Sequence, residues 1–269
     1  MSYSGWRYAT ASVIGTSHEK LGGQCQDAND CHVYVLPSGE TILMATVADG
    51  AGTAPRGGEG AGVACQVFAS LVNDHVSGGN TVEQISRQTA DFWLGVIQSA
   101  LDRRAESELR QRRDFACTLL GLVAGTSCAA CLQVGDGAIV VSDSEEHTYS
   151  HVFWPDRGEY ANMTHFVTQE EAKDHLQFEL IRRQIIEVAL LSDGLQGVAL
   201  NYQQQVAHEP FFRGLFAPLR RAAEGRSDDL SGALTTFLSS TRVTEKTDDD
   251  KTLVLASRIS GSLELSLST

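Results

Sequence analysis

Four aspartates lie at the ends of apolar runs in the 269-residue chain. Asp49, Asp136 and Asp193 each follow such a run and precede a glycine, and Asp249 lies just before the apolar run 251–256. One Asp-Gly after a strand is typical of a turn, because Asp caps backbone N–H groups and Gly adopts a positive φ. Several carboxylates at one rim of a sheet would instead repel one another. A hard cation such as Mg²⁺ or Mn²⁺ would remove that cost, since it prefers carboxylate, carbonyl and water ligands.

These positions suit the hydrolysis of a phosphate ester. Two divalent cations about 4 Å apart can orient and deprotonate a bridging water and polarise a phosphoryl oxygen. Other chemistries lack their motifs, because Ser192 is not in a G-x-S-x-G turn and neither G-x-x-x-x-G-K-S/T nor G-x-G-x-x-G occurs. The one C-x-x-C, from Cys128 to Cys131, lies in an apolar run without a second pair. We therefore expect reduced, buried thiols rather than a zinc or redox site.

A set of short motifs, in order along nearly the whole chain, resembles the metal-dependent type 2C (PPM) protein serine/threonine phosphatases. The motifs are an early acidic motif at 26–28, D-G-x-G at 47–52, G-D at 134–137, S-D-G at 192–195 and a late D-N-x-T-like motif at 249–252. Residues 113–118 and 158–166 are similar to a compact bacterial branch of stand-alone phosphatases.

The resemblance implies a role for each matching position. Asp49 would bridge two metal ions, and the carbonyl of Gly50 would hold the first. Asp193 and Asp249 would hold the second, while Asp136, together with Asp193, would serve a third and weaker ion. The ions would be Mn²⁺ or Mg²⁺.

The resemblance also implies the mechanism and the fold. Asp27 would be a catalytic residue that hydrogen-bonds metal-bound water, and water would attack phosphorus in line without a phosphoenzyme. The expected fold is an αββα sandwich, in which two central antiparallel sheets are flanked by helices. The metals would lie in a cleft at one edge, beside a flap within residues 144–180.

Three positions depart from the family pattern. Gly22 stands where many members have an arginine that grips the substrate phosphate, and Ala51 stands where some have a histidine general acid. Asp250 replaces the usual Asn and adds charge beside the metal ligand. His18 could donate to phosphate or protonate the leaving oxygen, and Arg56 could contact phosphate. The alternative for both is an ordinary surface residue.

Short strands and amphipathic helices must position these residues. Alternating or apolar runs predict strands at 31–36, 41–48, 115–125, 127–135, 137–143, 147–154, 177–183, 186–192, 251–259 and 262–267. Helical spacing predicts helices at 58–76 and 81–112 and around 213–224 and 227–240. Strands and helices occur in blocks rather than in strict alternation, which indicates an α+β architecture with largely antiparallel sheets.

The composition limits the partners. Lys and Arg number 21 against 34 Asp and Glu, a net charge of −13, which disfavours nucleic acid and anionic lipid. No apolar run approaches the roughly 18 residues of a membrane span, and residues 1–16 show no signal pattern. Without a linker or repeat, we expect one cytoplasmic, monomeric domain over residues 1–269.

The sequence thus predicts a phosphatase that removes phosphate from phosphoserine and phosphothreonine in proteins and is paired with a serine/threonine kinase. Two alternatives stay open. One is a phosphomonoesterase for small molecules. The other is a catalytically silent regulatory or binding module, which the missing arginine at position 22 favours. The retained aspartates count against silence, because clustered carboxylates destabilise a fold that binds no metal.

Overall fold

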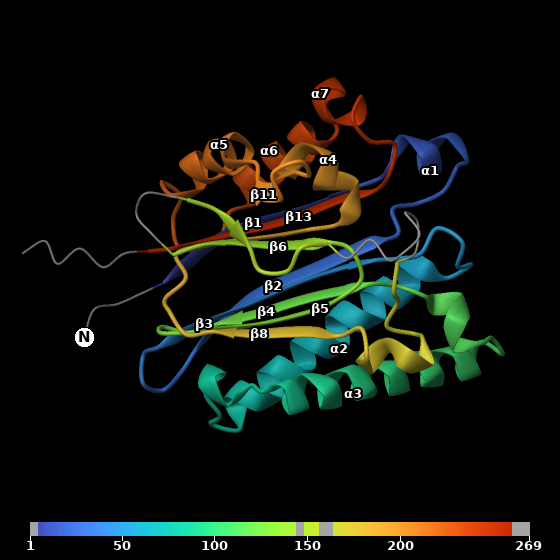
Figure 1. Cartoon of the computed structure of the whole chain (residues 1–269), viewed down its shortest axis with the longest axis horizontal. Helices are drawn as coiled ribbons and strands as arrows, with labels where there is room; N and C mark the ends of the chain where they lie inside the picture. Colours follow the sequence, from blue (N-terminus) through green and yellow to red (C-terminus); the bar gives the residue numbers. More distant parts are fainter. Residues whose placement is uncertain (1–4, 144–147, 156–163, 260–269) are drawn as a thin grey trace, which may run out of the picture.

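Two stacked β-sheets form the centre of the protein in the computed structural model, which describes residues 5–143, 148–155 and 164–259 (Figure 1). The first sheet has the order β12 (Gly225–Arg226), β1 (Trp6–Val13), β13 (Lys251–Arg258), β9 (Glu187–Leu191), β6 (Ala138–Ser142) and β7 (Ser150–His151). The second has the order β2 (Asp27–Val35), β3 (Thr41–Asp49), β4 (Leu119–Ala124), β5 (Ala129–Val134) and β8 (Gln177–Ile181). Neighbouring strands are antiparallel except β1 and β12.

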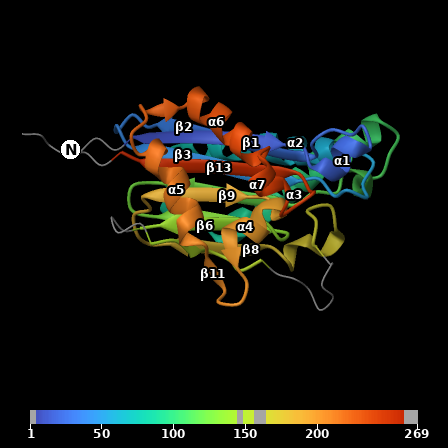
Figure 2. The same cartoon turned by 90° about the horizontal axis from the view of Figure 1, so that it is seen from above.

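Helices cover the outer face of each sheet. Helices α2 (Gly57–Ser77) and α3 (Arg87–Ser107) pack on the second sheet. The first sheet carries α5 (Glu209–Leu219) and α6 (Asp228–Leu238), together with the short helices α4 (Gln196–Ala199) and α7 (Thr241–Thr244) (Figure 2). The smaller elements are α1 (Thr16–Lys20), the hairpin β10 (Leu200–Asn201) and β11 (Val206–Ala207), and the 3₁₀ turns η1 (Val82–Gln84), η2 (Arg112–Phe115), η3 (Glu170–Lys173) and η4 (Asp193–Leu195). The predicted α+β, αββα sandwich is confirmed.

Burial of the strands on both faces explains their continuous apolar runs. In β3, Ile42 and Met44 face α2 and α3, whereas Leu43 and Ala45 face the other sheet. Side chains alternate between the faces of a strand, so a strand between two buried layers needs apolar residues at almost every position.

Several predicted boundaries are wrong. The helix predicted over 81–112 is divided: α3 begins after Ser86, whose side chain accepts a hydrogen bond from the Thr89 N–H at 3.2 Å, and Val82–Gln84 forms a separate 3₁₀ turn. At its other end, α3 stops before Leu109, which has a φ of 55°. An N-cap serine starts a helix, and a left-handed residue ends one.

The strand β1 is missing from the prediction, and the strand predicted over 147–154 contains only the two residues of β7. The helix predicted around 213–224 is α5, which begins earlier at Glu209 because Pro210 suits a first turn. The strand predicted at 262–267 lies outside the described residues. Among the described helices, none is long and apolar enough to cross a membrane.

Candidate metal centre

One cavity of about 310 Å³ gathers the predicted metal ligands. It is lined by Asp49, Asp136, Asp193 and Asp249 and by Gly50. The remaining lining residues are His18, Ala51, Gly52, Thr118, Thr164 and Phe166.

The stacking of the sheets explains this convergence. Asp49 ends β3 and Asp136 follows β5, both in the second sheet. Asp193 follows β9 and Asp249 precedes β13, both in the first sheet. The antiparallel strands deliver these four residues to the same end of the sandwich, so each sheet supplies two carboxylates.

Burial and mutual repulsion disturb the carboxylates. Burial raises the pKa of Asp49 well above its ordinary value, and the charges of Asp27 and Asp193 raise it further. Burial, with repulsion from Asp136 and Asp249, raises the pKa of Asp193 to about 7. The side chains of Asp49 and Asp193 also lie within hydrogen-bonding reach of each other. Burial and repulsion favour the protonated form of these carboxyl groups. A metal cation can neutralise them in place of the protons.

The residues around the cavity fit a hard divalent cation by their chemistry. Oδ1 of Asp193 is buried and has no hydrogen-bond partner among the described residues, so one carboxyl oxygen is available to a ligand. At Gly50 a Cβ would come within 2.2 Å of the Gly57 carbonyl carbon, so only glycine fits this turn. As the side chains stand, no three His, Cys, Asp or Glu residues within the described ranges are arranged to hold one ion. The carboxylates surround the cavity, and a cation would draw them together.

Asp27 lies beside Asp49 rather than on the cavity wall. It is paired with Asp49 in the register of β2 and β3, and its Oδ2 accepts a 2.7 Å hydrogen bond from Ser192 Oγ. That serine in turn accepts a 2.9 Å bond from the Thr252 N–H. Burial raises the pKa of Asp27 to about 6, although the hydrogen bonds from Ser192 and Thr252 oppose the rise. Asp27 therefore links the two sheets directly beside Asp49.

His18 lines the cavity, and Asp250 holds it there. His18 Nδ1 lies 3.0 Å from Asp250 Oδ2, and their side chains are 19% and 2% exposed. This is a close contact in which Nδ1 makes no well-directed hydrogen bond. The Asp250 carboxylate also accepts hydrogen bonds from the N–H groups of Gly15, at 2.6 Å, and Gln26, at 2.5 Å. Asp250 thus ties both ends of the α1 loop to the start of β13.

Arg56 lies outside this cavity. It lines a separate cavity next to Cys25 and Gln26, and its guanidinium contacts Glu108 at 3.1 Å and Glu59 at 3.7 Å. Gly22, the position of the absent arginine, has a φ of 68° and open space where a side chain would begin. Neither position supplies a cation to the metal cavity in this structure, and the phosphate role of Arg56 stays a prediction.

Two threonines of the cavity were not identified as site residues from the sequence. Thr164 Oγ1 donates to Asp136 Oδ2 at 2.6 Å, and Thr118 Oγ1 accepts from the Asp49 N–H at 2.9 Å. The only sequence signal for them is that both lie in the stretches 113–118 and 158–166. Of the predicted flap, residues 144–147 and 156–163 lie outside the described residues, whereas Thr164 and Phe166 border the cavity. The six cysteines are free thiols.

Comparison with known proteins identifies the family to which this fold and site belong. Residues 14–239 match the family model described as protein phosphatase 2C. Serine/threonine-protein phosphatase 3 of Escherichia coli K12 is 39% identical over 251 residues, 93% of this chain and 98% of that protein.

Two solved structures share the fold. The serine/threonine phosphatase Stp1 from Staphylococcus aureus has a TM-score of 0.60 at 15% identity, with 96% of this chain and 95% of that chain covered. The catalytic domain of the phosphatase PstP, solved with two manganese ions, has a TM-score of 0.58 at 17% identity, with 95% and 99% covered.

The fold, the ring of carboxylates and these relatives define a metal-dependent protein phosphatase. The chain belongs to the protein phosphatase 2C family.

Proposed function

We propose that this enzyme removes phosphate from phosphoserine and phosphothreonine side chains of proteins at the cavity between the sheet ends. The observation that carries the proposal is the convergence of Asp49, Asp136, Asp193 and Asp249 on one cavity. The E. coli relative is named a serine/threonine-protein phosphatase, which supports this substrate class. A family relationship and a complete carboxylate set together disfavour a silent binding module or a dedicated small-molecule phosphomonoesterase.

We assign the metal ligands as the sequence predicts. Asp49 would serve both of the first two ions, with the Gly50 carbonyl at the first and Asp193 and Asp249 at the second. Asp136, together with Asp193, would serve a third. The two manganese ions reported for PstP support a binuclear site. Bound Mn²⁺ or Mg²⁺ would activate water as a nucleophile and stabilise charge on the phosphoryl oxygens.

The chain's own residues would supply orientation and proton transfer. Asp27, held by Ser192, has an anionic oxygen beside Asp49 that can accept a hydrogen bond from the attacking water. His18 lines the cavity and can donate a proton to the leaving serine or threonine oxygen. Asp250 would be a positioning residue, because it anchors the His18 ring and the loop that carries it. Arg56 would reach substrate phosphate only after release from Glu108.

Further observations support a proposal for the localisation, domain organisation and oligomeric state of the enzyme. We place it in the cytoplasm, where six free cysteines would stay reduced. We assign it a single domain and a monomeric state, because its exposed large apolar side chains are scattered over different elements. A serine/threonine kinase would make its substrates. A flap within residues 144–180 would border the substrate, since Thr164 and Phe166 line the cavity.

The test is hydrolysis of an aryl phosphate and of a phosphothreonine peptide, with Mn²⁺, with Mg²⁺ and with chelator, by the wild type and by Asp49→Asn. We expect metal-dependent release of phosphate from both substrates and its loss in Asp49→Asn, which removes the bridging charge. Asp30→Asn, the same change on β2 at a partly exposed position, is the matched control and should keep full activity. An Asp49→Asn enzyme as fast as the wild type would refute the assignment. Hydrolysis of the aryl phosphate alone would favour a small-molecule enzyme.

A further inference from the structure

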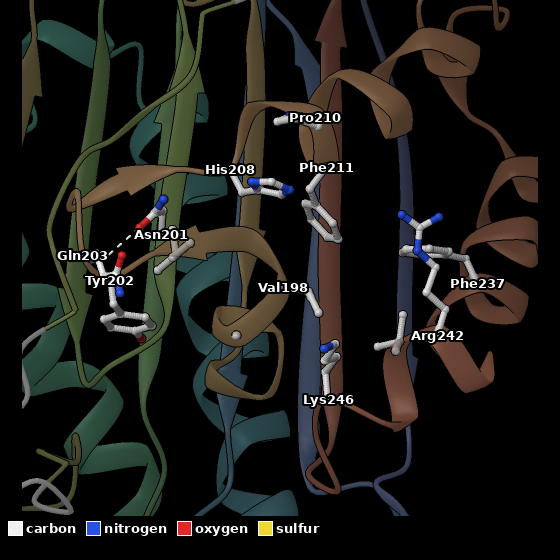
Figure 3. Close-up of a pocket in the computed structure, with 13 residues that line it drawn as sticks. Val198, Asn201, Tyr202, Gln203, His208, Pro210, Phe211, Phe237, Arg242 and Lys246 are labelled. Atoms are coloured by element: carbon white, nitrogen blue, oxygen red, sulfur yellow. Dashed lines mark hydrogen bonds between the residues drawn. The ribbon is translucent and has the colours of Figure 1, made fainter.

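A second cavity, of about 500 Å³, lies on the helical layer that covers the first sheet (Figure 3). Its walls come from α4, the β10–β11 hairpin, α5, α6 and α7. Its lining residues are Gly197, Val198, Leu200, Asn201, Tyr202, Gln203, His208, Pro210, Phe211, Phe237, Arg242, Val243 and Lys246. None of them lines the cavity that contains the four aspartates. We call it the α4–α7 pocket, and its volume is in the range of small-molecule sites.

The charge of this pocket is opposite to that of the protein. Arg242 and Lys246 line it, and no Asp or Glu does, although the whole chain carries a net charge of −13. Neither cation forms an ion pair with any residue in the described part of the chain. Two cations that lack a carboxylate partner, at the edge of a concave site, favour an anionic ligand such as a phosphate.

Aromatic rings form the body of the pocket. Phe211 and Phe237 have their ring centroids 6.2 Å apart with a 48° angle between the planes. In Figure 3, Phe211 lies between His208 on one side and Arg242 and Phe237 on the other, and Lys246 lies near Val198. Flat apolar faces beside cations fit a planar ring that carries a negative group. Asn201 and Gln203 lie on the side away from the cations. The side chain of Asn201 is bonded within its own turn, so Gln203 is the residue that can offer a polar group to the edge of such a ring.

A chain of hydrogen bonds joins this pocket to the metal centre. Tyr202, a wall of the pocket, donates its hydroxyl to Gln196 Oε1, and Gln196 Nε2 donates to the Asp136 carbonyl. The Tyr202 ring is itself packed against Trp154, with centroids 5.3 Å apart. Two other lining residues are close in sequence to proposed metal ligands. Gly197 follows Asp193 by four residues, and Lys246 precedes Asp249 by three.

We propose that the α4–α7 pocket binds a phosphorylated ligand of the nucleoside phosphate class and that its occupancy is coupled to the metal centre through Tyr202 and Gln196. The phosphate would contact Arg242 and Lys246, and the base would lie against Phe211 and Phe237. The proposal that the pocket binds this ligand depends only on the residues of the pocket. The coupling rests on the proposed function, because it assumes that Asp136 belongs to a metal site.

The binding arm uses calorimetric titration with the phosphonate analogue of adenosine monophosphate, in which a methylene group replaces the ester oxygen. This probe cannot be hydrolysed at the metal centre. Adenosine and methylphosphonate are the part-ligand controls. Arg242→Ala/Lys246→Ala should weaken binding roughly 100-fold, about tenfold for each cation. The charge-matched control is Arg103→Ala/Arg221→Ala, which removes two exposed arginines outside the pocket and should change affinity by less than about twofold.

The outcomes separate clearly. Probe binding that the Arg242/Lys246 variant loses and the control variant keeps would support the pocket. Equal losses in both variants, or no binding by the wild type, would overturn it. Methylphosphonate binding as tightly as the nucleotide analogue would overturn the role of the ring. An acidic peptide that binds in place of the analogue would identify a protein ligand and overturn the nucleoside class.

The coupling arm measures the affinity of the probe with and without Mn²⁺. Linkage requires the metal and the probe to alter each other's affinity by the same factor. We expect a several-fold change in the wild type that disappears in Tyr202→Phe, which keeps the ring but removes the hydroxyl that bonds to Gln196. An unchanged effect in Tyr202→Phe, or no effect of Mn²⁺ in the wild type, would refute the coupling while leaving binding intact. Failure of phosphate hydrolysis in the separate activity assay would refute the proposed function without altering the binding result.

Discussion

Replacing Asp250 by asparagine tests whether this residue organises the active site. Many family members have asparagine at this position, so the change restores the common residue. In this protein, however, Oδ1 accepts from the Gly15 N–H at 2.6 Å, and Oδ2 accepts from the Gln26 N–H at 2.5 Å. Oδ2 also lies 3.0 Å from His18 Nδ1. An amide has only one acceptor oxygen, so either orientation of the substituted side chain turns its NH₂ group toward one of these two backbone N–H groups, which are buried or partly buried.

The size of the effect follows from these contacts. A hydrogen bond to a charged group contributes roughly 1.5–3 kcal/mol, a neutral one about 1 kcal/mol, and an unsatisfied buried donor costs about 1–3 kcal/mol. The amide would keep one neutral bond and leave one donor unsatisfied. We therefore expect the free energy of unfolding to fall by at least about 3 kcal/mol, which for a chain near this size lowers Tm by at least roughly 6 °C.

The assay combines thermal unfolding with steady-state kinetics on a phosphothreonine peptide. Because His18 loses its anionic partner, kcat should fall by roughly tenfold while KM changes little. The control is Asp248→Asn, which removes a charge two residues away at an exposed position whose hydrogen bonds use only the backbone oxygen. An Asp250→Asn protein that matches the control in Tm and kcat would refute the organising role. A raised Mn²⁺ requirement would show instead that the change acts on Asp249.

Three further predictions concern the same cavity. His18→Ala should lower kcat roughly 100-fold on the phosphopeptide but far less on p-nitrophenyl phosphate, whose leaving group needs no proton; equal losses would exclude proton donation. Thr164→Val removes the 2.6 Å bond to Asp136 and should raise the Mn²⁺ concentration for half-maximal activity roughly tenfold, and an unchanged requirement would contradict the role of this bond. In chelator, the raised pKa values of Asp27 (about 6) and Asp193 (about 7), against an ordinary 3.8, mean that the folded protein binds more protons than the unfolded chain. Its Tm should therefore fall between about pH 5 and about pH 8, and saturating Mn²⁺ should abolish the fall; a higher Tm at about pH 8 in chelator would contradict the repulsion.

The central strand β3 and the helix α2 could be predicted from local patterns. The run in β3 is apolar at nearly every position because one face meets α2 and α3 and the other meets the first sheet. Helix α2 was predicted almost to its ends, since its buried face repeats at helical spacing. The strand β1 was not predicted, because its half-buried alternation is weak and its pairing with β13, 238 to 252 residues away, supplies the hydrogen bonds that define it.

By itself, the sequence predicted which aspartates would bind the metal ions and which reaction they would support. Aspartates at strand ends, three of them followed by a glycine, are local features, and ordered motifs identify them without knowledge of the fold. Only the tertiary structure decided which side chains contact one another around the cavity. Asp250 reaches His18 and Thr164 reaches Asp136 across long stretches of chain, and Arg56 is turned toward Glu108. Spacing in the sequence cannot show such contacts, because they depend on how the two sheets stack and on where the loops between them cross.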